Sequence, residues 1–316
     1  MSFSSACKAE LCKLPLTKPC CQVSLLCGLY QSLATLHLLG RSRISVQFTV
    51  KNYAIARYIY TICKKNLAIS PQLHFVKSPR FGGFQKCIIT IGPKDAPMVL
   101  ERLDMLRIRE DNSFLLLSTA PRTSISKNCC MRAYLRGMFL GGGMVTDPRK
   151  QYHVEIQYPN EIAQINLAKC FQRLSLPIKK SKRRHSQYLY LKSGDAITTF
   201  LTAIGATTAT MALEEVRVNR QVMQGINRAM NCDHYNIAKQ LTASNNQYQT
   251  ILAYSHTHSL DTLPDTLQSI ALARLKNPSA SLSELGATFS PPLTKNTVNQ
   301  RLRRLLQLIA RKDDFS

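Results

Sequence analysis

Apolar and polar residues alternate in two segments that lie far apart in the chain. Residues 43–50 read RISVQFTV and residues 151–158 read QYHVEIQY, and this alternation predicts strands with one buried face. Each predicted strand leads into a helix, at 53–66 in one case and at 160–174 in the other. Two more strands and a closing helix follow each time, with strands predicted at 72–78, 86–91, 178–184 and 187–192 and helices at 94–105 and 195–204.

A repeated motif stands before each of these patterns. The first copy reads CCQVSLLCGLY from Cys20, and the second reads CCMRAYLRGMF from Cys129. The cysteine pairs and the motif glycines recur at the same offset of 109 residues, and a fixed offset indicates an internal duplication. We therefore predict an α+β domain in which the order helix, two strands, helix, two strands, helix occurs twice.

The glycines of this motif predict a close approach between two helices. A glycine inside a helix costs about 1 kcal/mol relative to alanine, so its presence needs a structural reason. Two duplicated halves meet along a pseudo-two-fold seam, where a missing side chain lets helices come together. We expect Gly28, Gly137 and Gly141 at this seam, the last two on one helix face because they are four residues apart.

The C-terminal segment predicts three short helices. An apolar stripe from Leu267 to Leu275 indicates the first helix, which ends at Asn277-Pro278. Ser281 and Glu284 form a capping box that starts a second, short helix, predicted to end near residue 289. Thr294 caps a third helix over residues 295–311.

The third of these helices has two distinct faces. Its apolar residues follow the spacing of a buried stripe, at Val298, Leu302, Leu305 and Ile309. The remaining positions carry mainly Asn, Gln, Arg and Lys, which read base edges or contact phosphates in DNA. We predict a helix-turn-helix recognition helix whose DNA-contacting residues are Lys295, Asn296, Thr297, Asn299, Gln300, Arg301, Arg303 and Arg304. A small helical bundle with a solvated basic face would show the same pattern and stays open.

The charge balance indicates a polyanionic partner. The chain has 42 Lys and Arg against 18 Asp and Glu, a formal net charge of +24, and such a surface attracts DNA, RNA or anionic lipid without choosing among them. The densest basic run falls at a predicted hairpin turn. Sequence-independent phosphate contacts are expected from Lys179, Lys180, Lys182, Arg183 and Arg184. A solvated loop is the alternative interpretation.

The segment between the duplicated domain and the tail predicts a helical linker. Its acidic and basic residues around Arg217 are typical of solvated ion pairs on a helix, and the polar run at 244–247 is a candidate break. The expected domains are the first half at 1–105, the second half at 106–205, the linker at 206–261 and the helix-turn-helix at 262–316.

Secretion, metal binding and membrane insertion are not predicted. The N-terminus lacks the apolar core of a signal peptide, so the eleven cysteines are interpreted as reduced thiols. They include no Cys-x-x-Cys pair, the spacing typical of zinc sites, and no metal, cofactor or small-molecule ligand is expected. Residues 19–40 lack charged side chains, but polar residues and a glycine interrupt them, which favours a buried core helix over a membrane span.

A duplicated αββαββα unit with small residues in the first helix of each half resembles the LAGLIDADG homing endonucleases. The motif copies here are LCGLYQSLA from Leu26 and LRGMFLGGG from Leu135. In that family the eighth motif position carries an acidic metal ligand. Here that position is Leu33 in the first copy and Gly142 in the second, and neither side chain binds Mg²⁺. The resemblance therefore implies a DNA-binding scaffold without catalytic residues. A residual nuclease that uses other acids, such as Asp147 or Glu155, is the alternative.

Further motifs narrow the resemblance to the WhiA family. They are SFSS from Ser2, KAELC from Lys8, the run from Cys129 to Gly142, and NRAMNC from Asn227. The resemblance implies a bacterial cytoplasmic, nucleoid-associated protein that binds double-stranded DNA, acts in cell division and chromosome segregation, and regulates transcription in spore-forming relatives. Division or nucleoid proteins are further expected partners, and a protein-interaction scaffold is the alternative function.

Overall fold

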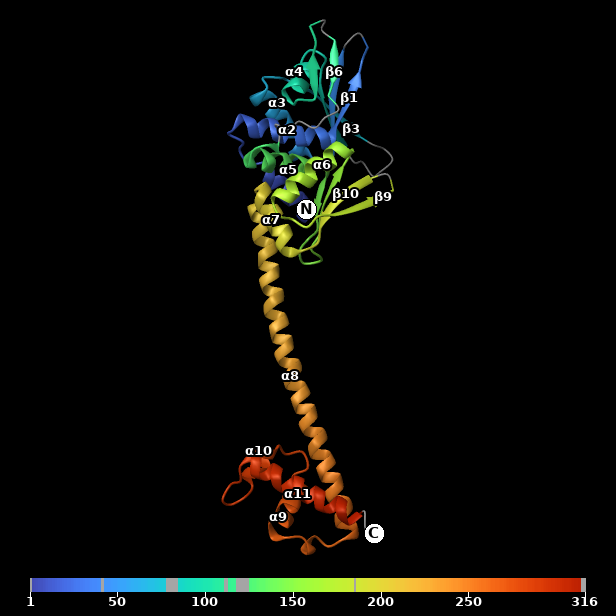
Figure 1. Cartoon of the computed structure of the whole chain (residues 1–316). Coiled ribbons are helices and arrows are strands. Elements are labelled where there is room, and N and C mark those ends of the chain that lie inside the picture. The colour runs from blue at the N-terminus through green and yellow to red at the C-terminus, as the bar shows by residue number, and fades with distance from the viewer. Residues whose placement is uncertain are drawn as a thin grey trace. The chain divides into compact units, whose positions relative to one another are not determined.

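The chain divides into two compact units, Met1–Arg220 and Gln221–Ser316. The computed structural model describes residues 2–40, 43–77, 85–110, 113–117, 125–184 and 186–313. All strands of the described residues belong to the first unit, and the described part of the second unit is built from helices and connecting turns (Figure 1).

The first half of the first unit is a four-stranded sheet with its helices. A short helix, α1 (Phe3–Leu11), precedes it. Its elements in chain order are α2 (Pro19–Leu33), β1 (Ala34–Leu38), β2 (Ile44–Val50), α3 (Tyr53–Asn66), β3 (Gln72–Lys77), β4 (Gln85–Ile91), α4 (Ala96–Arg102), β5 (Leu106–Ile108) and β6 (Phe114–Leu116). The sheet is antiparallel in the order β1-β2-β4-β3, and β5 pairs with β6 in a separate hairpin.

The second half repeats this arrangement. Its elements are α5 (Asn128–Gly142), β7 (Gly143–Val145), β8 (Val154–Tyr158), α6 (Glu161–Arg173), β9 (Lys179–Arg183), β10 (Ser186–Leu191) and α7 (Gly194–Ile204). Its sheet is antiparallel in the order β7-β8-β10-β9, so equivalent strands hold equivalent places in the two sheets. The predicted duplicated αββαββα fold is confirmed.

The first strand of each sheet follows its motif helix without a connecting turn. β1 begins at Ala34 directly after α2, and β7 begins at Gly143 directly after α5. The expectation of one core helix over residues 19–40 is therefore wrong beyond Leu33. A helix that passes directly into a strand leaves no turn residues to mark the boundary.

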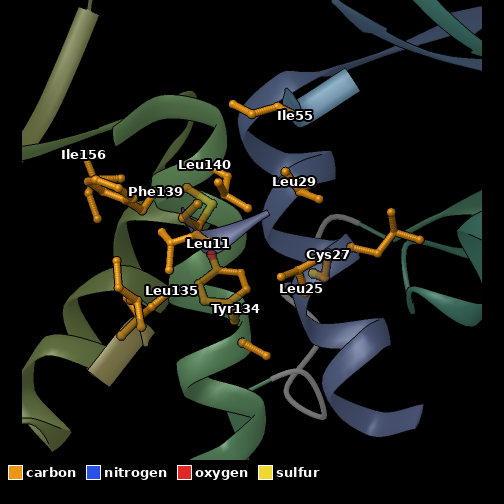
Figure 2. Packing of buried hydrophobic residues seen from close by; sticks show 14 of the residues in the cluster. Leu11, Leu25, Cys27, Leu29, Ile55, Tyr134, Leu135, Phe139, Leu140 and Ile156 are labelled. Atoms are coloured by element: carbon orange, nitrogen blue, oxygen red, sulfur yellow. The ribbon is translucent and has the colours of Figure 1, made fainter. Parts of the chain in front are cut away.

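Buried side chains of both halves form one core around α2 and α5 (Figure 2). Leu25 and Leu29 of α2 face the same core as Leu135 and Phe139 of α5, and all four are fully buried. Ile156 adds to it from β8. Each such side chain stabilises the fold by roughly 1.5–3 kcal/mol relative to its exposed state, so this seam is a main source of stability.

Glycines bring the backbones of α2 and α5 into contact. A Cβ atom added to Gly28 would overlap the carbonyl oxygen of Tyr134, and one added to Gly137 would overlap that of Leu25. Both obstacles are backbone atoms, which cannot rotate away as a side chain can. At Gly141 the added atom would meet the side chain of Ser32. The three glycines thus lie where α2 and α5 approach most closely.

A long helix, α8 (Thr207–Thr257), begins in the first unit and continues into the second. The candidate break at residues 244–247 is wrong, because all four residues are helical. Ser244 is buried, and its hydroxyl donates a hydrogen bond to the carbonyl of Leu241 (3.1 Å). A serine whose hydroxyl is satisfied within its own helix need not end that helix.

The N-terminus of α8 is capped by an acidic residue from the start of the chain. The carboxylate of Glu10 accepts hydrogen bonds from the backbone amides of Thr208 (2.7 Å) and Ala209 (3.2 Å) and from the hydroxyl of Thr207 (3.1 Å). These amides are among the donors that a helix leaves unpaired at its N-terminus, so α1 helps to fix where α8 begins.

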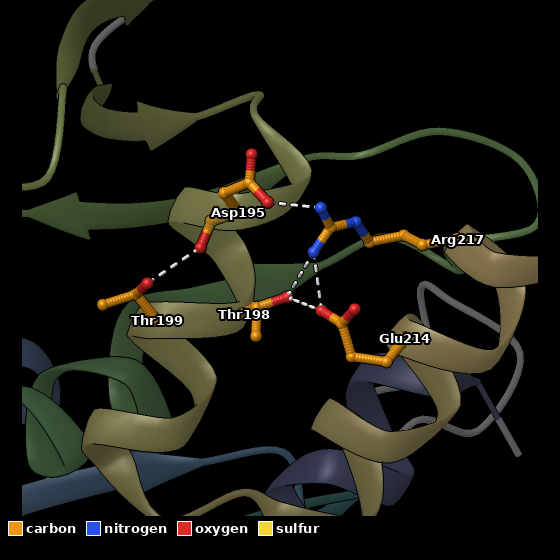
Figure 3. Close-up of polar contacts among 5 residues, drawn as sticks. All are labelled: Asp195, Thr198, Thr199, Glu214 and Arg217. Atoms are coloured by element: carbon orange, nitrogen blue, oxygen red, sulfur yellow. Dashed lines mark hydrogen bonds and ion pairs between the residues drawn. The ribbon is translucent and has the colours of Figure 1, made fainter. Parts of the chain in front are cut away.

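A polar cluster then joins α8 to α7 (Figure 3). Arg217 donates to the carboxylates of Glu214 (2.7 Å) and Asp195, and the hydroxyl of Thr198 donates to Glu214. The hydrogen bond from Thr198 and the nearby Arg217 guanidinium lower the pKa of the Glu214 carboxyl below its usual value. The first turns of α8 are therefore tied to the second half by charged hydrogen bonds.

The second unit has a small core of its own. After a 3₁₀ turn (Leu260–Thr262) come α9 (Asp265–Lys276), α10 (Leu282–Ala287) and α11 (Lys295–Asp313). Two residues of α8, Ile251 and Tyr254, complete the apolar core of these helices. The three predicted tail helices are confirmed, and α10 ends at Ala287, close to the predicted end near residue 289. Among the described residues, no helix is both long and apolar enough to cross a bilayer.

Candidate nucleic-acid interface

A buried arginine orders the connection between α9 and α10. Arg274 is almost fully buried, and its Nη1 donates to the carbonyl oxygens of Asn277 (3.3 Å) and Ala280 (2.6 Å). Burial lowers the pKa of this guanidinium. Arg274 loses its contact with water in order to bind these two carbonyl oxygens. Because its hydrogen bonds are made to the turn and not to solvent, we assign it a structural role. Sequence reasoning treated it as part of an amphipathic helix only.

The two helices after this turn are placed by local sequence signals. The predicted capping box is present, since Ser281 Oγ accepts from the amide of Glu284 (3.1 Å) and the Glu284 carboxylate accepts from the amide of Ser281 (2.7 Å). This contact lowers the pKa of the Glu284 carboxyl. A Cβ atom added to Gly286 would overlap the carbonyl of Leu293, so glycine lets α10 contact the segment before α11. Thr294 then caps α11, accepting from the amide of Thr297 (3.3 Å).

Helix α11 separates an apolar face from a polar and basic face. Its buried residues are those of the predicted stripe, Val298, Leu302, Leu305 and Ile309. Its exposed positions are Lys295, Asn296, Gln300, Arg303, Arg304, Gln307, Ala310 and Arg311. The exposed residues occur on successive turns of one helix and include the amide and guanidinium groups that recognise adenine and guanine edges. The exposed face of α11 thus carries most of the residues proposed from the sequence.

The other three proposed residues have different surroundings. Thr297 is partly buried, and its hydroxyl lies 2.9 Å from that of the cap residue Thr294. Arg301 is half-buried at the edge of the core. Asn299 lines a groove of roughly 620 Å³ beside α8, together with Lys239, Gln247 and other residues of the second unit. The proposed contacts of all eight residues with DNA stay a prediction.

The basic run of the second half forms an edge strand. The strand predicted at 178–184 is observed as β9 (Lys179–Arg183), which pairs only with β10 in the described sheet, so most of the basic run lies in the strand that leads to the hairpin turn. Only Arg184 lies at the turn, with a left-handed backbone (φ 52°). The lysines of β9 are exposed, whereas Arg183 binds the Glu155 carboxylate (2.9 Å) and lies over the ring of Tyr188. The run alternates across the strand, so its cations project from both faces of the sheet edge.

The positions that would hold catalytic metal ions in a LAGLIDADG nuclease lie at the ends of α2 and α5. They are Leu33 and Gly142, and neither helix contains Asp or Glu. The two alternative acids are paired with cations. Asp147 accepts two hydrogen bonds from the guanidinium of Arg149, which lower the pKa of its carboxyl. Glu155 is buried between Arg183 and His153.

One group of residues escaped the sequence analysis. The two cysteine pairs, Cys20-Cys21 and Cys129-Cys130, lie together at the N-termini of α2 and α5, with all four Sγ atoms within 4.8 Å of one another. Metal binding was not expected because no pair has Cys-x-x-Cys spacing. The signal was the equal offset of the two pairs, since a pseudo-two-fold axis brings equivalent residues near it together.

These features define a class of protein. A duplicated LAGLIDADG-like domain, without acidic residues on its two motif helices, precedes a helix-turn-helix domain. Family models match all three parts: the WhiA N-terminal LAGLIDADG-like domain over residues 19–106, the WhiA LAGLIDADG-like domain over 131–223 and the WhiA C-terminal HTH domain over 226–309. The chain belongs to the WhiA family, which confirms the resemblance drawn from its motifs.

Relatives of similar length support this assignment. The chain is 33% identical over 314 residues to the "Probable cell division protein WhiA" of Alkaliphilus metalliredigens, covering 99% of this chain and 98% of the relative. It is 34% identical over 308 residues to the protein of the same name from Alkaliphilus oremlandii, covering 96% of each. The crystal structure of full-length DUF199/WhiA from Thermotoga maritima has the same fold, with a TM-score of 0.61, 24% identity and coverage of 98% of this chain and 99% of that one.

Proposed function

We propose that this chain binds double-stranded DNA, with α11 in the major groove. The observation that carries the proposal is the exposed face of α11, where Asn296, Gln300 and Arg303 lie opposite the buried stripe. A helix of this kind, which follows a short capped helix, is the reading element of helix-turn-helix proteins. The WhiA C-terminal HTH family model, which covers α11 up to residue 309, supports this proposal.

We further propose a division of labour between the two units. The lysines of β9 would contact phosphates on any DNA, because a lysine ammonium is a point charge without base preference. Base preference would come from α11. The net charge of +24 supports a large phosphate contribution to affinity.

The biological role proposed is in cell division and chromosome segregation, as a transcriptional regulator or nucleoid-associated factor in the bacterial cytoplasm. The relatives named "Probable cell division protein WhiA" support it. We propose that the chain has no nuclease activity, because Leu33 and Gly142 cannot hold Mg²⁺. Nicking of supercoiled plasmid in Mg²⁺ or Mn²⁺ that is lost on Glu155→Gln or Asp147→Asn would contradict this.

The DNA proposal is tested by sequencing the genomic fragments that the purified protein retains at about 0.15 M salt. Enrichment of a few loci is expected. Arg303→Ala should weaken binding to these loci by about 5- to 150-fold, the equivalent of losing a base contact of about 1–3 kcal/mol, and should relax the base preference. Arg311→Ala is the matched control, because it removes the same charge from an exposed position two turns further along α11. Equal losses in the two variants, on specific and random DNA alike, would assign α11 a purely electrostatic role.

A second candidate function rests on the apolar side chains that α8 exposes. Val222, Ile226, Met230, Ile237 and Leu241 are about half-exposed and recur at intervals of four and seven residues. Such a stripe on one side of a helix is typical of a protein-binding surface. A division or nucleoid protein that co-purifies after nuclease digestion, and is lost on Ile226→Ser with Met230→Ser, would support a scaffold. Co-purification that disappears with the nuclease would contradict it.

A further inference from the structure

The cysteine cluster at the seam is built by symmetry from both halves. Cys20 and Cys21 are the second and third residues of α2, and Cys129 and Cys130 are the second and third residues of α5. One member of each pair is buried and the other is partly exposed. Each half therefore contributes the same two sulfur atoms from the same turn of its first helix.

The spacing of the sulfur atoms fits a single tetrahedral metal ion. All four Sγ atoms lie within 4.8 Å of one another, and those of Cys129 and Cys130 are 4.0 Å apart. In a tetrahedral zinc tetrathiolate each sulfur lies about 2.3 Å from the metal, which places the sulfurs about 3.8 Å from one another. Shifts of about 1 Å would therefore complete the coordination sphere. A cluster of two or more iron ions has a larger core and would hold the sulfurs further apart.

The surroundings of the cluster suit its charge. Four thiolates around Zn²⁺ carry a net charge of about −2. The N-terminus of each helix carries about half a positive charge and unpaired amide donors, and neither α2 nor α5 has a side-chain cap there. The N-cap residues are Lys18 and Lys127. The N-termini of two helices, each with a lysine at its N-cap position, thus meet where the thiolates would lie.

We propose that Cys20, Cys21, Cys129 and Cys130 hold one structural zinc ion that joins the two halves at the seam. Zn²⁺ suits the site because four thiolates in a tetrahedron are the donor set of structural zinc centres. The ion would connect residues more than 100 positions apart in the chain and fix the two motif helices to each other beside the glycine contacts. This role is independent of whether the chain binds DNA.

The metal content of the purified full-length protein tests the proposal directly. After expression in zinc-supplemented medium, plasma mass spectrometry should find about one zinc ion per chain. The double variant Cys20→Ser with Cys129→Ser, which changes the two partly exposed ligands, should retain at most about a tenth of that. Cys232→Ser is the matched control, because Cys232 is an exposed cysteine on α8 outside the cluster, and it should keep the full amount.

A second measurement avoids any risk that the double variant fails to fold. Replacing zinc by Co²⁺ in the wild-type protein should give the intense thiolate-to-cobalt absorption and the visible bands of a tetrahedral site. Absence of both zinc and cobalt uptake by the folded wild-type protein, with its thiols reduced, would overturn the proposal. Bound iron in place of zinc would overturn it as well. An intact mass lower by two or four hydrogen atoms would also overturn it, because each disulfide formed removes two.

Discussion

The edge strands β3 and β9 hold equivalent places in the two sheets but present different surfaces. β3 exposes Leu73, Phe75 and Val76, whereas β9 reads KKSKR and is exposed at four of its five positions. Lysines on an edge strand discourage pairing with a further strand and attract phosphates; the β3 edge has the opposite character. The duplication thus kept the strand order and let the solvent side diverge.

The seam between α2 and α5 shows the reverse behaviour. Both copies keep the glycine and the cysteine pair at equal offsets, and the glycines lie in backbone contact. Features shared by the halves therefore hold the halves together, and features that differ are candidates for partner binding. This distinction predicts which substitutions act on stability and which act on affinity.

The largest effect is expected at the shared seam. Gly28→Val and Gly137→Val should each destabilise the first unit by about 3 kcal/mol, because the new Cβ would overlap a backbone carbonyl that cannot move aside. Urea unfolding followed by circular dichroism measures the loss. Gly225→Ala is the control, since a Cβ there meets nothing within 4 Å, and it should stabilise α8 by up to about 1 kcal/mol. If only one seam variant were destabilised, the two copies would not be equivalent.

The second-largest effect is expected at the edge strand β9, on the affinity for DNA. Replacing Lys179, Lys180 and Lys182 by alanine should leave the unfolding free energy nearly unchanged, because these side chains are exposed. It should lower the slope of log affinity for DNA against log salt by up to about 3, because each phosphate that a lysine no longer neutralises reduces the slope by about 0.9. Lys86→Ala, at an exposed position of the first sheet, should leave the slope nearly unchanged, because no phosphate contact is proposed there. If replacing Lys86 changed the slope as much as replacing one lysine of β9, the two halves would not differ in their contact with DNA.

The smallest effect concerns the polar cluster of α7 and α8. The pKa of Glu214 is lowered by the hydrogen bond from Thr198 and by Arg217, so its folded-state pKa lies below its unfolded value. This contribution to stability is present above the unfolded pKa near 4.5 and is lost as the pH falls through the folded pKa. Glu214→Gln should therefore flatten the fall in unfolding free energy between about pH 6 and about pH 3. An unchanged profile would mean that the cluster adds nothing to stability.

Much of the fold was accessible from the sequence because buried positions impose periodicity. The alternation at residues 43–50 predicts β2, observed as Ile44–Val50, and the helix predicted at 53–66 is observed with those bounds. β1 and β7 were missed because each continues directly from a helix, and β7 is only three residues long. The run at 244–247 was misjudged because its polarity suggested a loop, although Ser244 satisfies its hydroxyl within the helix.

The candidate functional sites were also predictable only where they depend on residues within one helix. The buried stripe of α11 was predicted from helical spacing, and spacing also indicated which residues lie opposite to it. It could not show that Asn299 borders a groove beside α8, because that depends on a helix some sixty residues earlier in the chain. The cysteine cluster was missed for the same reason. Residue spacing within one segment does not show which residues of another segment lie beside it in the folded protein.

The cap that Glu10 places on α8 bears on how the protein is made. Glu10 and the amides it binds are separated by nearly 200 residues. At a synthesis rate of roughly 5–20 residues per second, α1 leaves the ribosome about 10–40 seconds before its partner exists. During this interval the buried side chains of α1, Cys7 and Leu11, lack part of their native surroundings. The contact between α1 and the N-terminus of α8 is therefore among the last in the first unit to form during synthesis. It forms when the first turn of α8, the helix that leads to the second unit, has been made.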